Sequence, residues 1–231
     1  MIAYDLKKQE PFMKPIALIS SLFLLSPLAA SELPKEFPEE LLGTHKAQFK
    51  RLKSAGKHIG CTIDYTVLHK NSLSRLDTFY TEGHISTLIA NGQPMMMFKF
   101  GLQPLSNIKS TTNVNFAYLG SGDIDTSAVE NISFEEVKGF KTFGYVLDQK
   151  TALLLLNLAK SNNLIISYNL TEDGFDHSFN VDLSVKELEV SATEVKKIRN
   201  SSTGTEFQEC TSKLIDQAIN ELNQAQKGQN S

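Results

Sequence analysis

The alternation of apolar and polar side chains that decides the fold lies at residues 59–68, which read Ile59-Gly60-Cys61-Thr62-Ile63-Asp64-Tyr65-Thr66-Val67-Leu68. The odd-numbered positions from Cys61 to Val67 share one face of an extended chain, and polar side chains lie on the other. This period of two predicts a strand with one face in the core. Similar segments follow at 76–81, 84–90 and 95–102, with turn signals at Gly83 and Asn91-Gly92 between them. We therefore expect an antiparallel meander, with further strands at 113–119, 134–137, 142–147, 164–170 and 177–185.

Three helices are predicted beside this sheet. Pro38 suits a first helical position and Gly56 suits a stop, so an N-terminal helix is expected over 38–56. Asp148 is placed to cap a short central helix at about 149–161. A capping box at Thr205 and Gln208 opens a C-terminal helix with an apolar face: Phe207, Cys210, Leu214, Ala218 and Leu222. The expected fold class is α+β, a largely antiparallel sheet with these N-terminal, central and C-terminal helices.

A secretory signal peptide is predicted at residues 1–30. Lys14 precedes a short apolar run at 16–28, and small residues follow it. The run is shorter than the roughly 20 apolar residues of a membrane-spanning helix. Acidic residues at Asp5 and Glu10 are unusual in a signal peptide, which favours Met13 as the start and leaves 1–12 untranslated. The mature chain is then expected to be one globular domain over 31–223 with a frayed polar tail at 224–231. It would lie in the bacterial periplasm or be secreted, with no membrane span after cleavage.

The chain has two cysteines, Cys61 and Cys210, and both lie on the apolar face of a predicted element. An even number of cysteines in an exported chain favours a disulfide. Such a bridge closes a long loop and contributes on the order of 4–5 kcal/mol in the chain-entropy model. His58 and Cys61 have the spacing of a zinc-ligand pair, but a structural zinc site needs four ligands and the sequence places no others beside them. We therefore predict a disulfide and no metal; two free buried thiols are the alternative.

Composition and motifs narrow the function classes. The chain carries 23 Lys and Arg against 26 Asp and Glu, a net charge of −3, which gives no electrostatic reason to expect nucleic acid. We find no phosphate-binding loop, dinucleotide fingerprint or nucleophile elbow, so the sequence predicts no cofactor and indicates no catalytic residue. The expectation is an exported, non-catalytic binding or accessory factor whose partner is another envelope or exported protein. A periplasmic or secreted hydrolase with dispersed site residues is the alternative, and whether the chain is an enzyme stays open.

The segment from Tyr145 to Val185 resembles the C-terminal half of the periplasmic invasion-associated locus B-like proteins. In both, a leucine-rich short helix precedes two strands that a polar turn joins, here Thr171-Glu172-Asp173-Gly174. The cysteine pair expected just before that helix is missing from this chain. The sequence is therefore not assigned to that family.

Overall fold

The computed structural model describes residues 39–70, 78–90, 93–105, 114–130, 132–137, 140–170, 176–191 and 194–229. All of them belong to one compact unit, Glu36–Ser231. The predicted signal peptide at 1–30, the predicted start at Met13 and the last two residues of the predicted tail lie outside the described residues.

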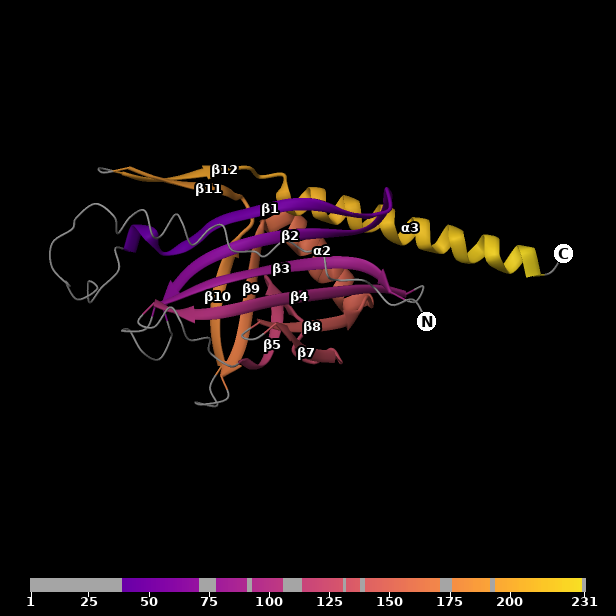
Figure 1. Cartoon of the computed structure of the whole chain (residues 1–231), viewed down its shortest axis with the longest axis horizontal. Helices are drawn as coiled ribbons and strands as arrows, with labels where there is room; N and C mark the ends of the chain where they lie inside the picture. The colour runs from indigo at the N-terminus through magenta and orange to yellow at the C-terminus, as the bar shows by residue number, and fades with distance from the viewer. Residues whose placement is uncertain are drawn as a thin grey trace. The chain divides into compact units, whose positions relative to one another are not determined.

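The described residues form three sheets in which every pairing is antiparallel (Figure 1). A six-stranded sheet has the order β1 (Gly43–Ser54), β2 (Lys57–Lys70), β3 (Thr78–Ala90), β4 (Gln93–Pro104), β8 (Phe140–Val146) and β7 (Ile132–Val137). A four-stranded sheet has the order β10 (Asp176–Asp182), β9 (Asn163–Leu170), β5 (Val114–Ser121) and β6 (Ile124–Asp125). The third sheet is a hairpin of β11 (Val185–Val190) and β12 (Val195–Arg199).

The expected α+β class is wrong, because the described chain is mostly strand and the N-terminal helix is absent from it. After one short 3-10 turn, η1 (Glu39–Leu41), residues 43–54 form β1 and pair with β2 from end to end. The apolar residues that suggested a helix are sparse, and pairing with a strongly β-forming neighbour overrides weak helix propensity. Ala55 and Gly56 have φ values of 48° and 79° and close a two-residue hairpin turn, so Gly56 ends a strand and not a helix.

The meander also differs from the expected one at Gly83. The two short strands predicted at 76–81 and 84–90 are parts of one strand, β3, and Gly83 lies inside it. Gly83 pairs with Tyr65 of β2, whose side chain covers it. The glycine therefore marks a close approach of a side chain to the backbone, and not a turn.

Two α-helices are described, α2 (Gln149–Ser161) and α3 (Thr203–Gln229). Asp148 caps α2 as expected, since its side chain accepts from the Thr151 amide, and Asn162 ends the helix in the left-handed conformation with φ 49°. The C-terminal helix starts at Thr203, before the predicted capping box, and runs on through residues 224–229 of the predicted tail. It packs on β1, β2 and β3 and on α2.

The core lies between the two large sheets and is rich in aromatic side chains. Phe98 of β4 stacks on Phe143 and Tyr145 of β8, with ring centroids 4.9 and 5.8 Å apart. Phe100 of β4 meets Tyr168 and Phe179 of the four-stranded sheet edge-on, at 6.0 and 6.2 Å. These rings are almost fully buried. Aromatic burial therefore joins the two sheets.

Candidate functional site

Cys61 of β2 and Cys210 of α3 are joined in a disulfide, as the sequence predicted, with their Cα atoms 6.1 Å apart. Both side chains are almost fully buried, at 0% and 3% exposure. The bond links the second strand of the large sheet to the C-terminal helix across 149 positions of sequence. It therefore fastens the helix that packs over one end of this sheet.

The imidazole of His58 lies beside both sulfurs. Its Nε2 atom is 3.7 Å from Cys61 Sγ, 3.4 Å from Cys210 Sγ and 2.9 Å from the carbonyl oxygen of Gly60. Residues three apart on a regular strand point to opposite faces, which would separate His58 from Cys61. The β1–β2 ladder, however, shifts register between Leu52 and Lys53, where residue 59 is the extra residue on β2. Such a bulge turns His58 to the side of Cys61.

This sulfur–imidazole cluster of His58, Cys61 and Cys210 is the group of possible metal ligands that stands out in the described part of the chain, and its ligand atoms lie within 4.8 Å of one another. With the sulfurs bonded to each other, only the imidazole offers a metal a strong ligand. The carbonyl of Gly60 accepts a hydrogen bond from the Nε2–H group in this state. In its oxidised form the cluster is therefore a buried crosslink with a half-buried histidine beside it.

A second histidine, His69 of β2, is buried in the aromatic core. Its ring stacks on Phe179 and Phe79 with centroids 4.4 and 5.7 Å apart, and its Nε2 lies 3.0 Å from Thr81 Oγ1. Burial, opposed in part by a hydrogen bond with the Lys70 carbonyl, lowers the pKa of His69 to about 4. A neutral imidazole in this position acts as an aromatic core residue with two polar partners, the Thr81 hydroxyl and the Lys70 carbonyl.

The sequence did not indicate a row of titratable side chains on the face of the six-stranded sheet that points away from the core. Asp64 of β2 pairs with His84 of β3, and His84 pairs with Lys99 of β4, so the three side chains are direct cross-strand neighbours. One row further along β3, Glu82 accepts a hydrogen bond from Tyr80 Oη at 2.9 Å. Burial raises the pKa of Glu82 above its usual range. The row stayed hidden because Gly83 was interpreted as a turn, which broke the register of β3.

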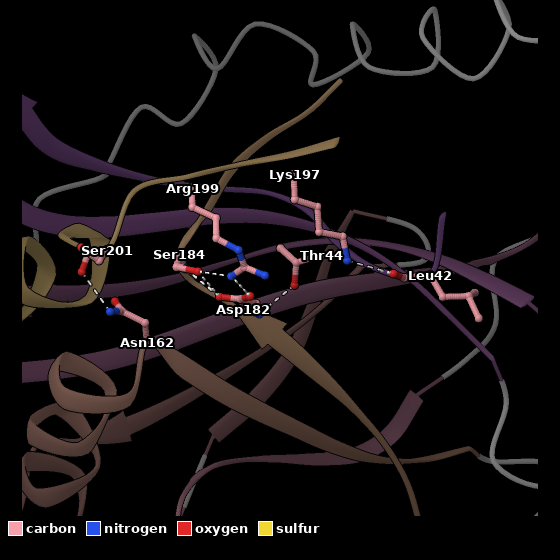
Figure 2. Close-up of polar contacts among 8 residues, drawn as sticks. All are labelled: Leu42, Thr44, Asn162, Asp182, Ser184, Lys197, Arg199 and Ser201. Atoms are coloured by element: carbon pink, nitrogen blue, oxygen red, sulfur yellow. Dashed lines mark hydrogen bonds and ion pairs between the residues drawn. The ribbon is translucent and has the colours of Figure 1, made fainter. Parts of the chain in front are cut away.

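The β11–β12 hairpin is held to the rest of the chain by polar contacts (Figure 2). Arg199 Nη1 donates to Asp182 Oδ2 and to Ser184 Oγ, both at 2.6 Å, and Lys197 Nζ donates to the Leu42 carbonyl at 3.2 Å. The amide of Asp182 donates to Thr44 Oγ1 at 2.7 Å. Desolvation of Asp182 is outweighed by hydrogen bonds from Ser184 and Arg199, so the pKa of this carboxyl lies below its usual range. These contacts place the hairpin beside β1.

A buried disulfide fits an exported protein. Within the described ranges, every helix is too short or too polar to cross a membrane.

The spacing in the sequence pairs His58 with Cys61, but it does not place Cys210 next to them, because Cys210 lies 152 positions after His58. Comparison of the chain with protein-family models, curated proteins and solved structures finds no match.

Proposed function

We propose that the chain is an exported bacterial envelope protein, periplasmic or secreted, that works by binding another envelope or exported protein. The observation that carries the proposal is the β11–β12 hairpin. Among the described strands, neither β11 nor β12 pairs with a third strand. An unpaired strand edge offers main-chain donors and acceptors to an extended segment of a partner, which is the mode of binding called β-strand addition.

The side chains of the hairpin support the same proposal. Lys186, Glu187, Glu189 and Lys196 are exposed, while Leu188, Val190, Val195 and Ile198 are only half-buried. A surface with polar side chains around partly accessible apolar ones is typical of a transient protein interface. The net charge of the chain is mildly negative, which does not favour nucleic acid as the partner.

Site-specific photo-crosslinking tests the proposal. A photoreactive residue replaces Lys196 on β12 in one variant and Lys213 on α3, away from any strand edge, in the other; both native side chains are exposed. Each variant is irradiated in the exporting bacterium, and adducts are identified by mass spectrometry. We expect a discrete adduct with an envelope or exported protein from position 196 and none from position 213. Equal adducts from both positions, or none from position 196, would contradict the proposal.

The alternative of a hydrolase draws support from the row of Asp64, His84 and Lys99 and from the raised pKa of Glu82 beside it. A carboxyl whose pKa is raised by burial is better suited to general acid catalysis than an ordinary one. The purified chain is assayed against peptide, ester and glycoside substrates, with Glu82→Gln as the inactive variant. Turnover that this substitution abolishes would establish a hydrolase and replace the binding proposal.

A further inference from the structure

We propose that His58, Cys61 and Cys210 form a Zn²⁺ site that becomes available when their disulfide is reduced. The proposal does not depend on the hairpin or on any partner. Imidazole nitrogen and thiolate sulfur are ligands that zinc prefers. The fold supplies one nitrogen and two sulfurs from two elements, β2 and α3, at one place.

The distances around the imidazole already suit a metal. A zinc ion about 2.1 Å from a histidine nitrogen and about 2.3 Å from a sulfur, at a tetrahedral angle, holds these two atoms about 3.6 Å apart. The observed distances from His58 Nε2 to the two sulfurs are 3.4 and 3.7 Å. Only the two sulfur atoms, which are bonded to each other in the oxidised form, have to separate, to about 3.8 Å. Rotation about the side-chain torsions of the two cysteines supplies this movement.

The chemistry balances with a dithiol as the reductant. The dithiol gives two electrons and two protons to the Cys61–Cys210 bond and is itself oxidised to a disulfide, leaving two thiols. Zn²⁺ then displaces both thiol protons to solvent and binds the two thiolates. In the oxidised form the Nε2–H group donates a hydrogen bond to the Gly60 carbonyl. The imidazole binds zinc through Nε2 once this proton has left to water and Nδ1 has taken one up from water. Three protein ligands leave the fourth position to water.

Packing around Cys210 keeps the cluster assembled when the covalent bond is open. Thr211 Oγ1 lies 2.7 Å from Thr87 Oγ1 of β3, and Phe207 and Leu214, one turn to either side of Cys210, are buried against the core. At the start of α3, the Gly204 amide donates to Asn162 Oδ1 at 3.1 Å. The helix is thus anchored on both sides of the sulfur, so reduction leaves Cys210 beside His58.

Cobalt titration of the full-length mature chain tests the proposal. Metal-free protein is reduced with a phosphine under argon and titrated with Co²⁺, which reports thiolate ligation by near-ultraviolet charge-transfer absorption; Zn²⁺ is then added as competitor. We expect one Co²⁺ per reduced chain, displaced by one Zn²⁺, and no such absorption for the oxidised chain. His58→Ala should weaken binding by more than the 10–100-fold that loss of an outer-shell partner costs, about 100-fold or above.

His45→Ala is the matched control, because His45 is also half-buried and also contacts one main-chain carbonyl, that of Leu41, through Nε2. Its affinity for Co²⁺ should equal that of the wild type. The proposal is wrong if the oxidised chain binds as tightly as the reduced one, or if His58→Ala binds as tightly as the wild type. Should reduction unfold the chain, Zn²⁺ has to restore the circular dichroism of the oxidised form, and failure to do so overturns the proposal as well.

Discussion

The aromatic core and the β11–β12 hairpin are both built from antiparallel strands, yet different forces hold them in place. Between the two large sheets, fully buried rings from β4, β8, β9 and β10 contact one another. The hairpin buries one apolar side chain fully, that of Val185, and is otherwise fastened by the ion pair and hydrogen bonds drawn in Figure 2. The side chains of the ion pair stay partly in water, with Arg199 58% and Asp182 38% exposed. Apolar burial contributes about 1.5–3 kcal/mol per large side chain, whereas an exposed ion pair contributes about 0–1 kcal/mol.

This difference indicates that local opening should need less free energy in the hairpin than in the core. Elements with few buried apolar contacts open locally at a lower free energy than the core. We therefore expect the hairpin to open without unfolding the two large sheets. That property suits the proposed role of its edge, since a partner's strand adds most easily where the host strand is not already committed to a sheet.

Truncation of a central ring should have the largest effect on stability. Phe98→Ala removes a ring that stacks on three others and is 0% exposed. We expect the free energy of unfolding, measured in urea, to fall by about 3–5 kcal/mol. Phe116→Ala is the control, since Phe116 is only half-buried, and it should cost clearly less. Similar losses for both variants would show that stability is not concentrated between the sheets.

The core should also respond to pH through His69. Because burial lowers its pKa to about 4, the unfolded chain binds a proton more readily than the folded chain between about pH 4 and the ordinary histidine pKa of about 6.5. The stabilisation is complete above this window and declines as the pH falls through it, by up to about 1.4 kcal/mol per pH unit. His69→Phe cannot titrate and should flatten this slope in urea unfolding measured at pH 7, 6 and 5. An unchanged slope would assign the pH dependence to other groups.

Gly83 tests the close packing on the large sheet. A methyl group there would overlap Tyr65 Oη and the Lys99 carbonyl, so Gly83→Ala should cost about 1–3 kcal/mol of unfolding free energy. Gly120→Ala, where the nearest atom would be 3.6 Å away, should be nearly neutral.

The substitution Tyr65→Phe gives a second test of the packing at Gly83. Its hydroxyl is buried and has no hydrogen-bond partner among the described residues. Tyr65→Phe should therefore leave stability unchanged or raise it, and in combination should recover part of the Gly83→Ala loss. A strongly destabilised Tyr65→Phe variant would reveal a partner for the hydroxyl and weaken the packing argument.

The smallest global effect is expected at the hairpin anchor. Arg199→Gln removes the ion pair with Asp182 and should lower the unfolding free energy by less than about 1 kcal/mol. Because the pKa of Asp182 is lowered, the pair is intact above the ordinary carboxyl range and is lost as the pH falls through the lowered value. The opening free energy of the amides in β12, obtained from exchange rates corrected for the intrinsic effect of pH, should therefore fall in acid for the wild type, and in the variant it should be low at both pH values. A cost of several kcal/mol would mean that the hairpin is part of the core.

Local patterns predicted those elements whose signals are themselves local. The alternation at 59–68 gives β2, and Asp148 and Asn162 bound α2 because caps act within one turn. The prediction of an N-terminal helix was wrong because residues 43–54 take their conformation from pairing with β2. The propensities of a single segment carry no information about such pairing. The placement of His58 beside Cys210 depends on a bulge and on the docking of a helix 152 positions away, and no sequence spacing encodes either.

Native-state hydrogen exchange of the oxidised chain tests the central contrast most directly, because it gives an opening free energy for each amide. The amides of β2 and β3 should open only with global unfolding, so their free energies should equal the value from urea denaturation. Those that pair β11 with β12 should open at a much lower free energy, and Arg199→Gln should lower it further without changing β2 or β3. Equal opening free energies in the two regions would contradict the account.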